Sequence, residues 1–438
     1  MEYLALWMFP VLLLILLTGF PIAFSLMGVA TIFGYITFGD TVIYQFIDKI
    51  DEVAGNFVLA AVPLFVFMGT MLEKSGIAER LFEAVHIWTR RLPGGLGVGT
   101  IFMCVIFAAS TGVIGATETV VGLLAIPVMM KHSYNKGLIS GTICAGGSLG
   151  TIIPPSVVVI IMGPIADVSV GDLFIGMIIP GLTMATLYVV YIMGRCYLRP
   201  QDGSLVTEDE YLPTLGERLW ITLTAFLPAA LMIFAVLGSI MLGLASPTEA
   251  AAMGAFGSVI LAAVYRTLTW TTLRLALLNT VKVTSMILMI LLAGSMFSGV
   301  FVGAGGTRVT TDLIAASDLS PWATLAVFLI IVFIAGFALE WISILLIFLP
   351  VFIPIVTQLG FDPVWFCILF LIVIQTSYLS PPMAPAIFYL RGIAPPEITM
   401  PDMFKGVVPF IILQLFTLAL VMAFPQMVLW LPEKVLGF

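Results

Sequence analysis

The stretch that decides the fold is GGSLGTIIPPS, at residues 146–156. Its first five residues match the G-x-S-x-G pattern, in which a nucleophilic serine sits on a sharp turn between a strand and a helix. Two prolines follow at 154–155, and proline interrupts a helix because it lacks an N–H group and its ring clashes with the preceding turn. The stretch therefore allows two interpretations: Ser148 as the nucleophile of a hydrolase, or a helix that is broken for another purpose.

Composition places the chain in a membrane. It has 438 residues, of which 61% are hydrophobic and only 9% charged, whereas soluble domains carry about 25% charged residues. Apolar runs of roughly 20 residues, enough to cross a lipid bilayer, recur from end to end. We expect an all-α polytopic membrane protein in a lipid bilayer, with no nucleic acid partner.

Several functions are disfavoured by missing motifs. The sequence contains no G-x-x-x-x-G-K-[ST] phosphate loop, which argues against ATP hydrolysis by this chain. Its four cysteines show no C-x-x-C spacing, which argues against a disulfide or metal framework.

Two apolar regions predict re-entrant helical hairpins. Small residues and Glu118 interrupt the middle of 96–130, and each arm of about 13–15 residues is short for a full span. Its flanks are basic, so both ends are predicted to face the cytoplasm. The second region, 321–356, is interrupted around Gly336 and Glu340 and has acidic flanks. It is therefore expected to enter from the opposite side.

The two regions belong to an internal repeat. Pro127 lies 27 residues before the Pro-Pro pair at 154–155, and Pro354 lies 27 residues before the pair at 381–382. The offset between the copies is constant (354 − 127 = 227). Each copy thus has a hairpin followed by a helix broken at Pro-Pro, and the flanking charges give the copies opposite orientations. Such an inverted repeat with paired broken helices is typical of the binding site of a secondary transporter.

These features predict how the chain is organised. The expected parts are scaffold helices at 1–73, an interfacial arm helix at 74–93, a first transport unit at 94–199 with hairpin 96–130 and broken helix 138–163, a cytoplasmic linker at 200–217, scaffold helices at 218–282, a scaffold helix with an outer arm helix at 283–320, and a second transport unit at 321–438 with hairpin 321–356 and broken helix 363–390.

The broken helices predict the site. Unwound helices free backbone carbonyls, which are tolerated in a membrane only where they are buried in protein, bind an ion or face a cavity. With neighbouring hydroxyls they suit Na+. One Na+ site is expected at Ser110, Thr111, Gly112, Gly147, Ser148, Gly150, Thr151 and Pro154. Its counterpart is expected at Gly336, Glu340, Thr376, Ser377, Ser380 and Pro381.

An organic anion is expected between the half-helix ends, where amide groups point at the ligand. Its candidate contacts are Gly115, Ser148, Ser156, Ser343, Ser377 and Arg391. A simpler interpretation applies to each hydroxyl, which can bond back to its own helix. For Arg391 the simpler interpretation is a basic residue at the cytoplasmic end of its span. Glu118 is expected to be structural.

Two other functions remain open at this stage. An intramembrane serine hydrolase would need Ser148 to meet a histidine at membrane depth. The only histidines, His86 and His132, lie in an interfacial helix and a basic loop. A channel-like permease driven by a separate ATPase would instead predict uptake that depends on ATP.

Longer motifs show a family resemblance. The segments AAVPLFVFMGTMLEKSGIAERL, LPGGLGVGT, GGSLGTIIPPS, GDLFIGMIIPGL, SPTEAAAMGAFG and LSPPMAPAIFYLRGIAPPE resemble the DctM-like large membrane subunit of TRAP (tripartite ATP-independent periplasmic) transporters, within the ion-transporter superfamily. The resemblance implies a non-enzymatic importer in the bacterial inner membrane, with Na+ as the coupled ion and an elevator mechanism. Its implied partners are a small four-helix membrane subunit and a periplasmic substrate-binding protein that delivers an organic anion.

The resemblance also bears on the substrate. The segments STGVIGATETVVGLLAIP and FSGVFVGAGG are similar to a branch assigned to 2-oxo acids, hydroxy acids or aromatic carboxylates. Glu340 stands where that branch usually has Asp, and Glu118 where a small or apolar residue is usual.

Overall fold

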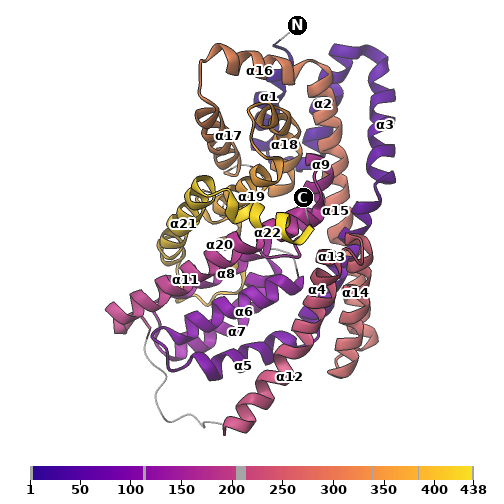
Figure 1. Ribbon diagram of the computed structural model, residues 1–438. Coiled ribbons are helices and arrows are strands. Elements are labelled where there is room, and N and C mark those ends of the chain that lie inside the picture. Colours follow the sequence, from indigo (N-terminus) through magenta and orange to yellow (C-terminus); the bar gives the residue numbers. More distant parts are fainter. Residues whose placement is uncertain (1–2, 112–114, 204–213, 338, 383, 437–438) are drawn as a thin grey trace.

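The computed structural model describes residues 3–111, 115–203, 214–337, 339–382 and 384–436, without the side chains at 110, 111, 116 and 436. Within these ranges the regular elements are all helical (Figure 1). Eight helical stretches are long and apolar enough to cross a membrane. The chain is therefore an all-α polytopic membrane protein, as its composition predicted.

One side of the molecule is built around long helices, several of which lie on the right in Figure 1. The elements of this scaffold side are η1 (Ala5–Trp7), α1 (Met8–Leu17), α2 (Ile22–Phe38), η2 (Gly39–Thr41), α3 (Val42–Gly55), η3 (Phe57–Ala60), α4 (Ala61–Lys74), α12 (Leu215–Ile233), η6 (Phe234–Gly238), α13 (Ser239–Met241), α14 (Pro247–Val264) and α15 (Trp270–Gly303). The 34-residue α15 spans about 50 Å at 1.5 Å per residue. It packs against α2, α3 and α4 and also against α18 of the other side.

The predicted boundaries on this side need two corrections. The division between 282 and 283 falls inside α15, because the Thr269 side chain caps that helix thirteen residues earlier than expected by accepting from Thr272 N–H. The predicted linker at 200–217 extends past the start of the next helix. Thr214 and Glu217 form a capping box, which starts α12 at Leu215.

The other side holds two units with matching element order. The first contains α6 (Gly95–Thr111), α7 (Ala116–Lys131), α8 (Lys136–Ser148), η4 (Leu149–Thr151), α9 (Val157–Ala166), α10 (Val170–Gly176), α11 (Ile178–Leu198) and η5 (Pro200–Asp202). The second contains α17 (Pro321–Ala335), α18 (Trp341–Gln358), α19 (Pro363–Leu379), α20 (Pro385–Ile393), α21 (Met400–Ala423) and α22 (Gln426–Leu436).

The two units repeat in detail. Helices α8 and α19 begin at Lys136 and Pro363, the same 227-residue offset that the prolines show. Asn135 caps the first by accepting from Leu138 N–H at 3.1 Å, and Asp362 caps the second by accepting from Trp365 N–H at 3.0 Å. Both helices break at a Pro-Pro pair, and both Pro-Pro bonds are cis. The two broken helices contact each other in the middle of the molecule.

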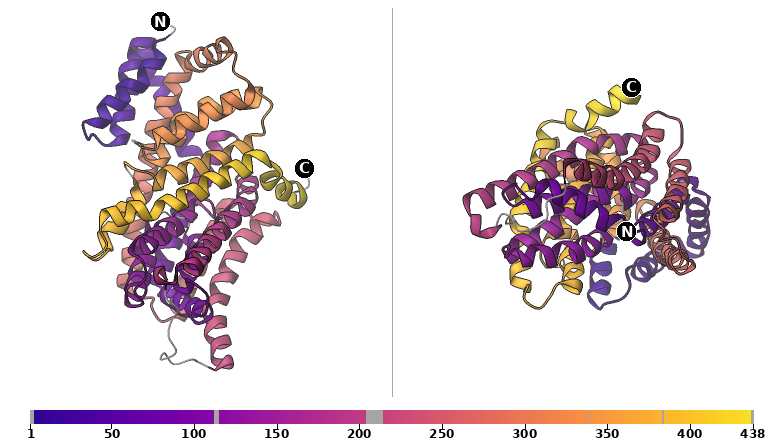
Figure 2. Two further views of the ribbon diagram at one scale, coloured as in Figure 1. Left: turned by 90° about the vertical axis from the view of Figure 1, so that its left-hand side faces the viewer. Right: turned by 90° about the horizontal axis from the view of Figure 1, so that it is seen from below.

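A short amphipathic helix accompanies each unit. Helix α5 (Ile77–Thr89) precedes the first unit, and α16 (Gly306–Ala316) precedes the second. Each begins after a left-handed glycine, Gly76 (φ 71°) or Gly305 (φ 82°), a conformation that glycine adopts without a steric penalty. The two helices lie at opposite ends of the molecule (Figures 1 and 2).

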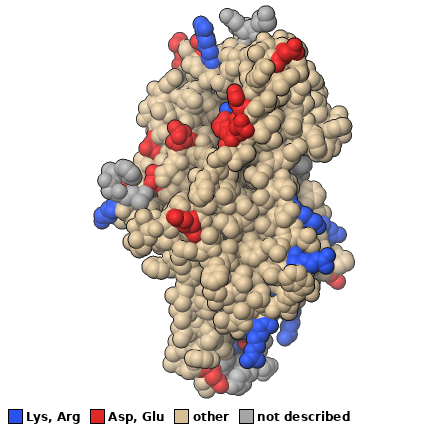
Figure 3. All heavy atoms as spheres, turned by 90° about the vertical axis from the view of Figure 1, so that its right-hand side faces the viewer, with Lys and Arg blue, Asp and Glu red and all other residues tan. Residues whose placement is uncertain are grey.

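Surface charge distinguishes these two ends. On the face in Figure 3, acidic side chains gather over the upper part and basic ones over the lower part, the end that holds α5. By the positive-inside rule the α5 end is the cytoplasmic one. This agrees with the orientation expected from the basic flanks of the first hairpin.

Candidate functional site

The two units meet at a buried polar contact. Ser148, the last residue of α8, donates to the carbonyl of Ala145 at 2.9 Å and accepts from Gln375 Nε2 at 3.2 Å. Gln414 Nε2 of α21 also approaches Ser148 Oγ, at 3.4 Å. All three side chains at this contact are fully buried. Ser148 and Gln375 are 227 residues apart, so equivalent positions of the two copies touch, as happens only near the axis that relates them.

A cavity of about 320 Å³ lies between the two sides of the molecule. The scaffold contributes Ile22 of α2 and part of α15, and the two units contribute residues of α9, α18, α19 and α20. The lining residues are Ile22, Val157, Val158, Val283, Met286, Ile287, Gly336, Leu339, Glu340, Trp341, Ile344, Ile374, Ser377, Tyr378, Pro385 and Tyr389.

Besides α2 of the scaffold, which begins after Pro21, three helices of the two units begin at this cavity without a side-chain cap. They are α9 after Ser156, α18 after Glu340 and α20 after Ala384. Eight other helices are capped by a side chain: α8, α10, α12, α14, α15, α17, α19 and α21, by Asn135, Ser169, Thr214, Ser246, Thr269, Ser320, Asp362 and Thr399. Helices α1, α3, α4, α5, α11, α13 and α16 also lack a side-chain cap, but their first residues do not line the cavity. Uncapped N-termini keep amide groups available, and their dipoles favour an anion.

Two serines in the first turns of these helices also lack partners. Ser156 and Ser343 are fully buried, and neither hydroxyl hydrogen-bonds any described protein atom. Buried polar groups are nearly always paired in native proteins, so an unpaired one calls for a missing water, ion or ligand. Both residues belong to the predicted substrate contacts.

The predicted first Na+ site lies behind the cavity lining. Gly147, Ser148, Gly150, Thr151 and Pro154 are all buried along the first broken helix, and none of them lines the cavity. Thr151 donates to the carbonyl of Ser148 at 2.9 Å. The side chains of Ser110 and Thr111, and all of Gly112, lie outside the described residues.

The residues of the predicted second Na+ site lie near the second broken helix. Gly336, Glu340 and Ser377 share the cavity wall. Thr376, Ser377 and Ser380 donate back into α19, to the carbonyls of Ile372, Ile374 and Thr376 at 2.7–2.8 Å. Each hydroxyl retains lone pairs that could bind a cation, but its proton is donated within its own helix, as the simpler interpretation predicted. Pro381 is exposed beside the break.

Of the six predicted substrate contacts, only Ser377 is among the residues that line the cavity. Ser148, Ser156 and Ser343 are buried beyond the lining, and Gly115 and Arg391 also lie outside it. Arg391 is exposed, and its Nη1 donates to the carbonyl of Ile398 at 3.0 Å. Gly115 adopts a positive φ of 83°, and a Cβ there would lie 3.0 Å from the Tyr389 ring. Gly115 thus lets the start of α7 approach α20.

Glu118 is fully buried and has a structural partner. Its Oε2 accepts from Gly115 N–H at 2.6 Å and caps α7. Oε1 has no partner among the described atoms. The side chain lies against Gly147, where an added Cβ would overlap its Cγ and Cδ atoms. Gly147 is therefore needed to accommodate this carboxylate.

Sequence reasoning missed several residues of the site. Gln375 had a usable signal, because it lies at the repeat offset from Ser148. Gln414, Tyr378 and Tyr389 had none, since aromatic and amide residues occur throughout membrane helices.

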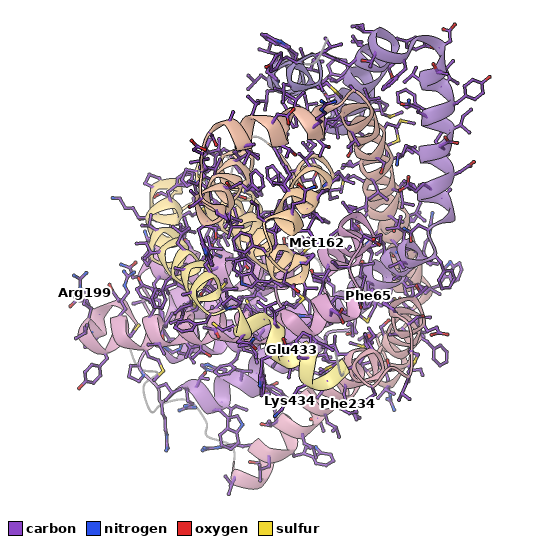
Figure 4. All side chains as sticks on the ribbon, turned by 45° about the horizontal axis from the view of Figure 1, so that its top comes forward. Phe65, Met162, Arg199, Phe234, Glu433 and Lys434 are labelled. Carbon is purple, nitrogen blue, oxygen red and sulfur yellow. The ribbon has the colours of Figure 1, made fainter. Side chains whose placement is uncertain are left out.

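Around the cavity, α9 also packs on α4. Figure 4 shows the buried Phe65 of α4 and Met162 of α9 inside the molecule.

The geometry argues against a serine nucleophile. Ser148 ends a helix and is preceded by no strand, whereas the nucleophile elbow requires a strand before the serine. Its described hydrogen-bond partners are the Ala145 carbonyl and two glutamine amides, and no histidine.

An inverted repeat of hairpins and broken helices around a central cavity defines a secondary transporter. The family model described as the tripartite ATP-independent periplasmic transporter, DctM component, matches residues 9–427. The chain therefore belongs to this family and is a membrane subunit of a transporter, not an enzyme. This confirms the resemblance seen in the sequence motifs.

Individual relatives support the same family assignment. The C4-dicarboxylate TRAP transporter large permease protein DctM of Pseudomonas aeruginosa is 30% identical over 388 residues, covering 88% of each chain. The 2,3-diketo-L-gulonate TRAP transporter large permease protein YiaN of Escherichia coli is 28% identical and covers 95% of this chain and 96% of its own. The solved YdaH transporter of Alcanivorax borkumensis has a similar fold, with a TM-score of 0.66 at 15% identity, over 95% of this chain and 99% of that one.

Proposed function

We propose that this subunit imports small organic carboxylates, coupled to Na+, by moving its two units as one body against the scaffold. The observation that carries the proposal is the convergence of four uncapped helix N-termini, those of α2, α9, α18 and α20, on one cavity. The described lining contains no Lys, Arg or His, so amide groups and helix dipoles supply the positive potential for the carboxylate.

Glu340 provides a physical reason for ion coupling. Its carboxylate lines the same cavity, and two negative charges about 5 Å apart repel by roughly 3 kcal/mol at an effective dielectric constant of 20. A Na+ ion between Glu340 and the substrate replaces this repulsion by two attractions. Gly336 and Ser377, on the same wall, are suited to complete its oxygen shell. In this scheme the anion binds well only when Na+ is present.

The apolar remainder of the cavity favours a compact carboxylate such as a 2-oxo or hydroxy acid over a dianion. Tyr378, Tyr389 and Trp341 surround the substrate body. Other parts of the proposal follow from the family: a small membrane subunit, a periplasmic substrate-binding protein that delivers the anion, and a place in the bacterial inner membrane.

Substituting the two unpaired serines tests the substrate site. In liposomes holding the complete transporter, Ser156→Ala and Ser343→Ala should each raise the KM for the anion about tenfold, since a hydrogen bond to a charged group is worth about 1.5–3 kcal/mol. Ser140→Ala is the matched control, because that buried hydroxyl is satisfied by the Lys136 carbonyl at 2.8 Å. Unchanged KM values in both serine variants would place the substrate elsewhere.

A further inference from the structure

A second cavity lies on the scaffold, away from the transport site. This groove of about 560 Å³ is formed where α5, α12 and the end of α14 meet. Its lining residues are Arg80, Trp220, Leu223, Thr224, Leu227, Pro228, Val264, Tyr265 and Arg266. It lies at the cytoplasmic end of α12 and α14, since α12 follows the basic-flanked first unit and α14 ends at Val264, two residues before Arg266.

The apolar wall of the groove faces the membrane. Trp220, Leu223, Leu227 and Pro228 recur at the spacing of one face of α12. Leu223 is 52% exposed, Leu227 46% and Val264 68%. From Trp220 to Pro228 the wall is about 12 Å long, at 1.5 Å per residue. That length suits the upper part of an acyl chain, with Trp220 at headgroup depth.

The polar end of the groove is fixed by a chain of contacts. Pro228 has no N–H group, which leaves the carbonyl of Thr224 without its helical partner. Tyr265 Oη donates to that carbonyl at 3.1 Å. The guanidinium of Arg80 then stacks on the Tyr265 ring, 4.3 Å from the centroid, in a cation–π contact. Arg80 is thus held at the mouth of the groove.

Arg266 adds a second charge at an unusual backbone position. Its φ is 58°, and its N–H and that of Thr267 bond to the carbonyls of Ala263 and Ala262 at the end of α14. Glycine is the usual residue at this helix-ending position, because it has no Cβ to clash. The sequence therefore places a guanidinium where the backbone prefers glycine.

Neither of these two charges has an ion-pair partner among the described residues. The lining contains no carboxylate, and neither Arg80 nor Arg266 forms an ion pair with a described acidic side chain. We propose that the groove binds an anionic phospholipid of the cytoplasmic leaflet. The phosphate lies between Arg80 and Arg266, and one acyl chain lies along α12. Basic pockets between membrane helices on this side favour such headgroups.

Lipid retention in detergent tests this site. The complete transporter is purified, and nondenaturing mass spectrometry counts bound phosphatidylglycerol and phosphatidylcholine of identical acyl chains. The native protein should prefer phosphatidylglycerol by about 30-fold, since each basic side chain near the headgroup contributes about fivefold. Arg80→Gln with Arg266→Gln should abolish the preference. Arg199→Gln with Arg274→Gln, exposed basic residues outside the groove, should keep it.

Arg266→Gly separates binding from folding. Glycine suits the left-handed position, so this variant should keep or raise the melting temperature while losing about fivefold of the lipid preference. sn-Glycerol 3-phosphate alone should compete weakly, because it cannot fill the apolar wall. Equal retention of both lipids by the native protein, full competition by the soluble phosphate, or a lipid-free groove covered by the small membrane subunit would each overturn the proposal.

Discussion

Gly147 shows how one position in the G-x-S-x-G stretch is constrained by packing. A methyl group there would overlap the side chain of Glu118, and overpacking of this kind costs about 1–3 kcal/mol. Gly147 occupies the unspecified second position of the G-x-S-x-G pattern, yet it has to be glycine because it makes room for a buried carboxylate that caps α7. The motif match was therefore misleading about chemistry while the helix break beside it was informative.

Gly147→Ala should lower the melting temperature of the purified protein by several degrees. Combining it with Glu118→Ala, which removes the clashing atoms, should cost less than the two separate effects together. Gly392→Ala is the control, because nothing lies within 4 Å of a Cβ at that position. A Gly147→Ala protein as stable as the control would show that the packing described here is wrong.

Glu340 should control the requirement for Na+. Glu340→Gln removes the charge that we propose to hold the ion, so the Na+ concentration for half-maximal uptake should rise about tenfold, the worth of a charge-assisted contact. Glu397→Gln changes an exposed carboxylate outside the cavity lining and should leave the Na+ dependence unaltered. If uptake by the Glu340→Gln variant depends on Na+ concentration in the same way as uptake by the native protein, this role is contradicted.

At the scale of elements, much of the architecture was predictable from two kinds of residue. The Pro-Pro pairs and their constant offset located both broken helices, because proline acts locally on its own helix. The approach of α21 to this pair of helices was not predictable, since the Gln414 amide reaches Ser148 across 266 residues. The start of α15 was also missed, because a Thr cap rather than the apolar pattern sets it.

The contact between the broken helices should be measurable as a coupling energy. Ser148→Ala and Gln375→Met each remove the hydrogen bond that joins α8 to α19, so their effects on the unfolding free energy should fall short of additivity by about 0.5–1.5 kcal/mol. Ser148→Ala combined with Thr376→Val should be additive, because Thr376 bonds within its own helix. Strict additivity in the first pair would mean that the contact contributes nothing.

At the scale of the whole molecule, the proposed transport mechanism requires the two units to move against the scaffold. Gly294 of α15 lies against Leu346 of α18. A disulfide between cysteines at these two positions therefore links the scaffold to the two units. In a background without the four native cysteines, oxidation should stop uptake and reduction should restore it. A link between Gly122→Cys and Ile393→Cys, on α7 and α20 of the same body, should be harmless. Full uptake with the first pair linked would rule out this movement.

Uptake into liposomes shows whether a Na+ gradient drives transport. The subunit is reconstituted with its small membrane partner, the binding protein is supplied outside with its radiolabelled anion, and an inward Na+ gradient is compared with an equal K+ gradient. We predict accumulation of the anion above its outside concentration with Na+ alone, collapsing when the Na+ gradient is dissipated. Accumulation that is equal in Na+ and K+, or that needs ATP, would contradict the account.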